Sequence, residues 1–176
     1  PSIVSIESQS QSEYGTGTGI IMTEDGYIIT NAHVVAGADE VRVALSNNSV
    51  LQASLVGFDA DEDLAVLKVD ASGLTPAEFG DSAALRIGDP VAAIGDPLGY
   101  RSTITDGIIS ALDREVEVDG TTMVLIQTSA AINFGNSGGA LINQYGQVVG
   151  VTTIKIVTED GSAEALGFAI PTTRVK

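Results

Sequence analysis

The chain has 176 residues, of which 44% are hydrophobic and 20 are glycine, and it contains no cysteine. A chain of this length can bury a substantial core, so we expect a globular fold that needs no disulfide bonds. With 8 Lys and Arg against 23 Asp and Glu, the net charge is −15, which would repel a phosphate backbone and argues against nucleic acid as a partner. No apolar run approaches the ~20 residues that a membrane-spanning helix needs, so we predict no membrane segment in this chain.

The first 70 residues contain short apolar or alternating segments separated by turn residues, a pattern that predicts β-strands. The predicted strands cover residues 3–6, 15–22, 27–30, 41–45, 50–57 and 64–69. Asp25-Gly26 and Asn47-Asn48 are typical of tight turns. Residues 8–13 predict a polar loop, and residues 31–35 predict a short turn.

Residues 71–89 interrupt this rhythm with scattered glycine and proline, and they include a short helix capped by Asp81 or Ser82. We interpret this segment as a linker between two units. The strands predicted after it cover residues 91–94, 103–112, 123–128, 140–143, 148–154 and 166–170.

Two sets of six strands and almost no helical periodicity indicate an all-β fold. Six-stranded antiparallel sheets of this size avoid exposed edges most readily by closing into barrels. We therefore predict an N-terminal barrel over residues 1–70 and a C-terminal barrel over residues 90–176, with a cleft between them that holds the functional site.

The most informative motif is Gly135-Asn136-Ser137-Gly138-Gly139, which lies between two apolar segments. Glycines allow a tight turn that would leave the Ser137 hydroxyl exposed, and backbone N–H groups in such a turn can point into one concavity. The N–H groups of Gly135, Asn136 and Ser137 are therefore candidates for an oxyanion hole. The alternative is an ordinary β-turn, for which Asn, Ser and Gly are the commonest residues.

Two further side chains favour the catalytic interpretation. His33 is the one histidine and follows a predicted strand, although a lone histidine is more often structural. Asp63 opens the buried run at 64–69, where a carboxylate needs a partner that compensates its lost hydration, such as an imidazole N–H. A hydroxyl, a base of near-neutral pKa and a carboxylate are the groups that nucleophilic acyl transfer requires. Their chain order, His, Asp, Ser, is that of chymotrypsin-type double barrels.

Several segments together resemble the motifs of the HtrA (DegP/DegS-like) family of trypsin-fold serine proteases. They are Thr30-Asn31-Ala32-His33-Val34-Val35, Asp63-Leu64-Ala65-Val66-Leu67-Lys68, Ala93-Ile94-Gly95-Asp96-Pro97-Leu98-Gly99, Thr105-Asp106-Gly107-Ile108-Ile109-Ser110-Ala111, Gly135-Asn136-Ser137-Gly138-Gly139-Ala140-Leu141 and Leu166-Gly167-Phe168-Ala169-Ile170-Pro171. The resemblance covers most of the chain. It implies a trypsin-like double barrel with His33, Asp63 and Ser137 as the catalytic triad.

The resemblance also implies an ATP-independent endopeptidase that degrades unfolded or misfolded proteins in extracytoplasmic quality control or stress response. The family acts in the bacterial periplasm, at the cell surface or after secretion. Its members often form homotrimers and carry a PDZ domain, which here would lie beyond Lys176. Asp96 departs from the family pattern, which usually has Asn or Ser at this position.

Specificity depends on the pocket beside the nucleophile. Ala131, six residues before Ser137, occupies the position at which trypsin-type recognition of Lys or Arg needs an acid. A small apolar slot is therefore predicted, which favours cleavage after small to medium aliphatic residues. Its lining residues are Ala131, Ile132, Phe134, Thr153, Ile154, Lys155, Leu166 and Phe168.

Other functions are less well supported. Asp59 to Asp63 begins like a Ca²⁺ loop, but Leu64 replaces the required glycine, so no metal site is predicted. The glycine-rich stretch at 15–19 lacks a lysine and a following helix, so no nucleotide or other cofactor is expected. The alternative function is a catalytically silent module that binds a peptide as an added strand near residues 152–155.

Overall fold

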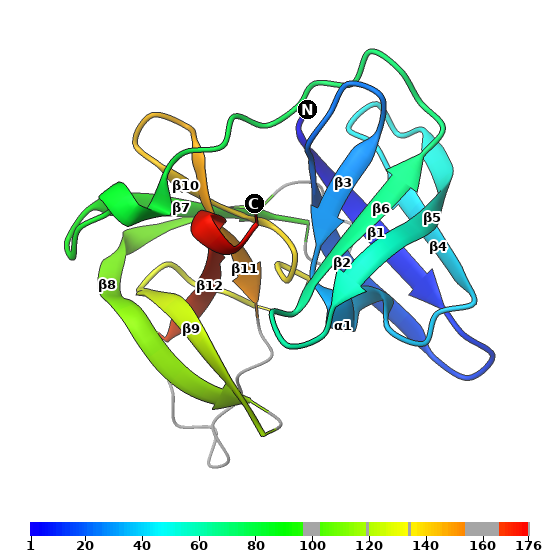
Figure 1. Cartoon of the computed structure of the whole chain (residues 1–176). Helices are drawn as coiled ribbons and strands as arrows, with labels where there is room; N and C mark the ends of the chain where they lie inside the picture. The colour runs from blue at the N-terminus through cyan, green and yellow to red at the C-terminus, as the bar shows by residue number, and fades with distance from the viewer. Residues whose placement is uncertain (97–102, 119, 134, 154–165, 176) are drawn as a thin grey trace.

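In the computed structural model, which describes residues 1–96, 103–118, 120–133, 135–153 and 166–175, twelve β-strands pair into two closed barrels (Figure 1). All pairings between these strands are antiparallel. The predicted all-β fold of two six-stranded barrels is therefore confirmed. In its described part, the chain has no helix long and apolar enough to cross a membrane.

The first barrel has the strand order β1-β2-β3-β6-β5-β4, and β4 pairs back with β1 to close it. Its strands are β1 (Ile3–Gln9), β2 (Tyr14–Ile21), β3 (Tyr27–Thr30), β4 (Glu40–Ala44), β5 (Val50–Asp59) and β6 (Leu64–Val69). The β2–β3 turn requires Gly26, because its φ is +103° and a Cβ there would lie 2.5 Å from the Val69 carbonyl oxygen.

The second barrel repeats this topology in the order β7-β8-β9-β12-β11-β10, and β10 pairs with β7 to close it. Its strands are β7 (Pro90–Gly95), β8 (Thr103–Val118), β9 (Thr121–Thr128), β10 (Ala140–Asn143), β11 (Val148–Thr153) and β12 (Gly167–Pro171). Closing both sheets leaves few strand edges open to other chains, which is the reason for which barrel closure was predicted.

Several predicted boundaries are wrong. β1 continues to Gln9, because Ser8 and Gln9 pair with Gly15 and Tyr14 across the hairpin, where a polar loop was predicted. β8 continues to Val118 rather than ending at residue 112, and its pairing with β9 resumes after register shifts. Residues 32–35 form a single-turn helix, α1 (Ala32–Val35), in place of a simple turn. Residue 154, the predicted end of a strand, lies outside the described residues.

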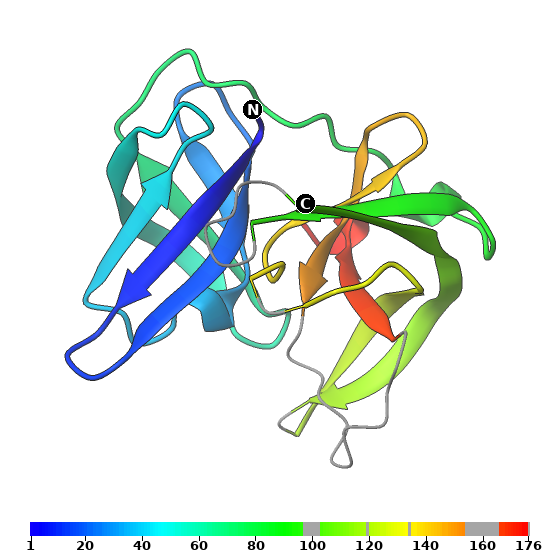
Figure 2. The same ribbon diagram turned by 180° about the vertical axis from the view of Figure 1, so that it is seen from behind.

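The segment between β6 and β7 runs along both barrels (Figures 1 and 2). Its Ala77 N–H donates to Ile21 of the first barrel at 2.9 Å, and its Glu78 carbonyl accepts from Val148 of the second at 2.8 Å. It contains a short 3₁₀ helix (Ser82–Ala84) that is capped by Asp81, whose carboxylate accepts from the Ala83 N–H. The division into residues 1–70, 71–89 and 90–176 remains our proposal for the domain boundaries.

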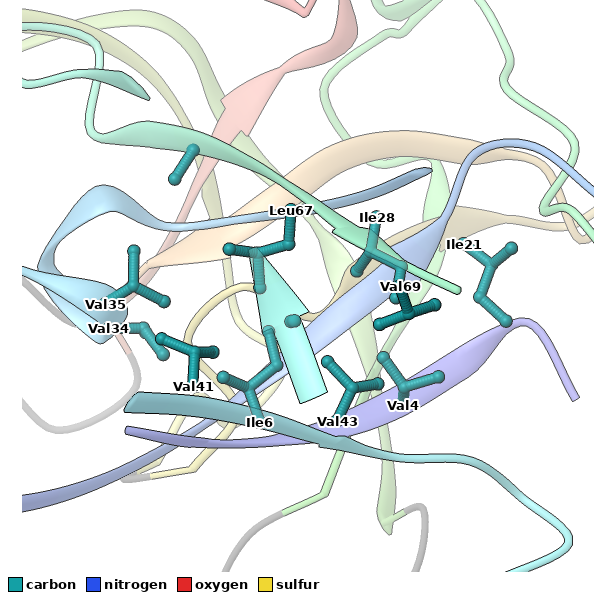
Figure 3. Packing of buried hydrophobic residues seen from close by; sticks show 12 residues of the cluster. Val4, Ile6, Ile21, Ile28, Val34, Val35, Val41, Val43, Leu67 and Val69 are labelled. Carbon is teal, nitrogen blue, oxygen red and sulfur yellow. The ribbon is translucent and has the colours of Figure 1, made fainter. Parts of the chain in front are cut away.

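Branched aliphatic side chains fill the first barrel, where they point toward one another (Figure 3). The side chains that are at most 1% exposed there include those of Val4, Ile6, Ile28, Val43 and Leu67. Full burial of a side chain of this kind is worth roughly 1.5 to 3 kcal/mol relative to exposure.

A second buried cluster joins the two barrels. It contains Ile20, Ile29 and Leu64 from the first barrel together with Met123, Leu125, Val151, Phe168 and Ile170 from the second. The barrels therefore share part of their hydrophobic core. Side chains from both barrels can consequently be held at defined positions where the barrels meet.

Candidate active site

His33 lies on α1, which follows β3 after one residue. β3 contributes Ile29 to the cluster that both barrels share. The start of α1 is tied to Asp63, whose carbonyl oxygen accepts from Asn31 Nδ2 at 3.0 Å and from the Ala32 N–H at 3.1 Å. The His33 side chain is 34% exposed. The helix thus presents the imidazole to solvent while its backbone is anchored to the loop before β6.

Asp63 is 1% exposed and has a φ of +52°, in the left-handed region that aspartate tolerates better than most residues. Its carboxylate lies 2.8 Å (Oδ2) and 3.0 Å (Oδ1) from His33 Nδ1, and Oδ1 also accepts from the His33 backbone N–H at 3.0 Å. Oδ2 accepts from Thr153 Oγ1 of the second barrel at 3.1 Å. These donors offset the hydration that the buried carboxylate loses.

The contact between Asp63 and Nδ1 defines which nitrogen of the neutral imidazole carries the proton. A carboxylate only accepts, so in neutral His33 the proton sits on Nδ1 and Nε2 carries the lone pair. An imidazole in this tautomer can accept a proton from a hydroxyl at Nε2. The arrangement is that of a general base oriented by a carboxylate.

The Ser137 turn lies between β9 and β10 and is held by backbone hydrogen bonds. Gly138 N–H donates to Thr152 O, Thr152 N–H donates to Gly139 O, and Gly139 N–H donates to Asn136 O, all at 2.9 Å. Gly138 has a φ of +83°, and a Cβ there would lie 2.1 Å from the Thr18 carbonyl oxygen. Only glycine therefore fits beside the serine.

Ser137 is 5% exposed as a whole residue. The turn packs against β2, where Thr18 N–H donates to Ser137 O at 2.8 Å, a contact that engages the backbone carbonyl rather than the hydroxyl. Ser137 and Gly135 nevertheless line a cavity of about 370 Å³ together with His33.

Tyr14 also lines this cavity, and burial together with a hydrogen bond to Glu7 raises the pKa of its phenol.

The candidate oxyanion donors differ in their backbone partners. Asn136 N–H donates to the Asn133 carbonyl at 2.9 Å, so it is used within the turn, and we correct the prediction that it serves the oxyanion hole. Gly135 has a φ of +95°, which allows the chain to reverse two residues before the nucleophile. Gly135 and Ser137 remain the candidate donors.

Three of the described residues of the predicted pocket, Thr153, Phe168 and Ile132, lie in neighbouring positions. Thr153 on β11 pairs with Phe168 on β12, and a Cβ on Gly167 would lie 2.7 Å from Ile132 Cγ1. Phe168 is 8% exposed and Leu166 is 45% exposed. Ala131 is exposed, and its carbonyl accepts from Thr105 Oγ1 at 2.8 Å. Phe134, Ile154 and Lys155 lie outside the described residues.

Three contributions were missed by the sequence analysis. Asn31 anchors α1, Thr153 binds the Asp63 carboxylate in addition to its predicted place in the pocket, and Thr18 contacts the nucleophile turn. The signal for Thr18 was its position between two glycines in residues 15–19, a pattern that indicates close backbone approach.

The comparisons with known proteins agree with this architecture. The trypsin-like peptidase domain family matches residues 17–151. A probable periplasmic serine endoprotease, DegP-like, from Halomonas elongata is 48% identical over 165 residues, which cover 94% of this chain and 34% of that protein. The serine protease Do-like HtrA of Bacillus subtilis is 46% identical over 182 residues, which cover 98% of this chain and 40% of that protein.

Solved structures give the same result. The structure of the HtrA-type protease AlgW with a tripeptide matches with a TM-score of 0.90 and 43% identity, over 99% of this chain and 57% of that one. The chain spans about a third to two-fifths of the length of the curated relatives it matches. The chain belongs to the trypsin-like peptidase family, as a protease domain of the HtrA type.

Proposed function

We propose that the protein is a serine endopeptidase that uses Ser137, His33 and Asp63 as a catalytic triad. The observation that carries the proposal is the position of His33. Its Nδ1 lies 2.8 Å from the buried Asp63 carboxylate, and the residue lines the same cavity as Ser137. Asp63 orients the imidazole, His33 acts as the base, and Ser137 is the nucleophile.

In the proposed reaction, His33 Nε2 takes the Ser137 hydroxyl proton as Oγ attacks the scissile carbonyl carbon. The carbonyl oxygen gains negative charge, which the N–H groups of Gly135 and Ser137 stabilise. His33 then returns the proton to the leaving amine, and an acyl-enzyme remains on Ser137. A water molecule, deprotonated by His33, hydrolyses the ester and restores the free serine.

The biological setting is proposed from the relatives. The Halomonas elongata protein is named a periplasmic endoprotease, and we propose an extracytoplasmic location for this protein also. Its substrates would be unfolded or misfolded proteins, because an extended chain can enter the open cavity that His33 and Ser137 line. We also propose a PDZ domain in the full-length protein, since the matched relatives are much longer than this chain and leave room for a further domain. Assembly as a homotrimer is proposed from the resemblance to the HtrA family.

Labelling by a fluorophosphonate probe tests the catalytic assignment. The probe reacts with a serine that is activated by a base and faces an ordered oxyanion hole, so the wild-type protein should be labelled and Ser137→Ala should not. A peptide substrate added in excess should slow the labelling. Absence of labelling in the wild-type protein, combined with retained peptide binding, would instead support the silent peptide-binding module.

We predict cleavage after Val, Ile, Leu or Ala rather than after Lys or Arg. Ala131 supplies no carboxylate for a cationic side chain, whereas burial of an aliphatic side chain gains roughly 1 to 3 kcal/mol. The measurement is digestion of a denatured protein, with the new C-termini mapped by mass spectrometry. A majority of cuts after Lys or Arg would overturn the pocket assignment.

A further inference from the structure

Thr18 of the first barrel makes an unusual set of contacts with the second barrel. It is fully buried, and its hydroxyl donates to the Gly135 carbonyl at 2.6 Å and accepts the Asp96 N–H at 2.8 Å. Its own N–H donates to the Ser137 carbonyl at 2.8 Å. One side chain and one amide thus connect β2 to the nucleophile turn and to the end of β7.

The strand pairing explains why this site is open to the turn. β3 pairs with β2 only at Ile20 and Ile21, so the β2–β3 ladder does not extend to Thr18. There the Thr30 hydroxyl at the end of β3 donates to the Thr18 carbonyl at 2.7 Å, and the Thr18 N–H is left to the nucleophile turn. The Ser137 turn occupies this edge of β2. The approach is close, since a Cβ on Gly17 would lie 3.2 Å from the Ser137 carbonyl oxygen.

The Thr18 hydroxyl binds the peptide group that joins Gly135 to Asn136. The carbonyl of this group is bound by Thr18, and its N–H, which belongs to Asn136, is bound by the Asn133 carbonyl. A peptide group is planar, so bonds at both ends define its orientation. That orientation, together with the positive φ of Gly135, determines where the preceding Gly135 N–H points.

The other candidate donor is held without the Thr18 hydroxyl. Ser137 N–H belongs to the peptide group whose carbonyl, on Asn136, accepts from Thr152 Oγ1 at 2.6 Å and from Gly139 N–H at 2.9 Å. Loss of the Thr18 hydroxyl should therefore affect one of the two donors.

We propose that Thr18 is a positioning residue for the oxyanion hole, whose hydroxyl bridges the Gly135 carbonyl and the Asp96 N–H and so orients the Gly135 N–H. This inference rests on the proposed serine endopeptidase function. Removal of one oxyanion donor costs about 10² to 10³ in kcat. Misorientation of a donor that stays present should cost less, so we expect a fall of roughly 10- to 100-fold.

The test compares Thr18→Val, Thr18→Ser and wild-type protein on a fluorogenic peptide, with kcat and KM measured separately. Thr18→Val should lower kcat by roughly 10- to 100-fold with little change in KM, because the oxyanion forms only in the transition state. It should also weaken inhibition by a peptide aldehyde, whose adduct places an oxygen in the hole, by a similar factor. Thr18→Ser keeps the hydroxyl and should restore most of kcat.

Thr172→Val is the matched control for the loss of two buried hydrogen bonds. Thr172 is 3% exposed, and its hydroxyl donates to Gly80 O at 3.0 Å and accepts the Ser82 N–H at 3.1 Å, away from the nucleophile turn. It should lose thermal stability but keep kcat. If Thr18→Val does not fold, Thr18→Cys, with a weaker donor and acceptor of similar size, takes its place in the series.

The outcomes separate the two proposals. A Thr18→Val protein whose kcat and aldehyde affinity stay within about threefold of wild type would overturn the positioning role, as would a loss confined to KM. If the wild-type protein neither hydrolyses peptides nor reacts with the fluorophosphonate, the endopeptidase proposal itself fails.

Discussion

Ser137→Ala should lower kcat for peptide hydrolysis by roughly 10⁶-fold, the size of effect that follows when a triad loses its nucleophile. Alanine has no oxygen to form the acyl-enzyme. The fold should persist, because the hydrogen bonds from Thr18 N–H to Ser137 O and from Gly138 N–H to Thr152 O use only backbone atoms. The measurement is steady-state hydrolysis of a fluorogenic peptide, with circular dichroism to verify the fold.

Ser82→Ala is a suitable control, because Ser82 is 6% exposed and lies in the 3₁₀ helix of the segment between β6 and β7, where its hydroxyl accepts from the Thr173 N–H. It should retain the wild-type rate. Peptide binding by Ser137→Ala should be close to that of the wild type, since the pocket walls are unchanged. Hydrolysis by Ser137→Ala at a rate near that of the wild type would refute the assignment of the nucleophile.

Asp63→Asn should lower kcat by about 10⁴-fold. The Asp63 carboxylate accepts hydrogen bonds from the backbone N–H of His33, from His33 Nδ1 and from Thr153 Oγ1. An amide in its place has one oxygen and one NH₂ group, and an NH₂ group facing Nδ1 places the imidazole proton on Nε2. Imidazole in that tautomer has no lone pair toward Ser137 and does not act as the base.

The control for this change is Asp59→Asn. The Asp59 carboxylate accepts from the backbone N–H groups of Asp61 and Glu62 at 2.9 and 3.0 Å, in an exposed turn of the same loop. Asp59→Asn should keep the wild-type kcat. Asp63→Asn should show the lowered kcat while circular dichroism shows an intact fold. A kcat in Asp63→Asn within tenfold of the wild type would remove Asp63 from the mechanism.

The strands were predictable because their signal is local. An apolar run such as 64–69 or the Asp25-Gly26 turn restricts the backbone through nearest neighbours alone. The boundaries that were predicted wrongly depend on a partner strand. Ser8 and Gln9 are strand residues because Gly15 and Tyr14 lie opposite them. The end of β8, beyond residue 112, is a strand because β9 lies opposite it.

For the candidate site, the sequence by itself determined which residue types are present and in what order, since a serine in a glycine-rich turn, one histidine and one aspartate before a buried strand are chemical facts of the chain. Only the tertiary structure decided which atoms meet. Thr153 reaches Asp63 across 90 residues, and Thr18 reaches Gly135 across 117. Contacts of this range arise from the packing of one barrel on the other, and no local preference of the backbone encodes them.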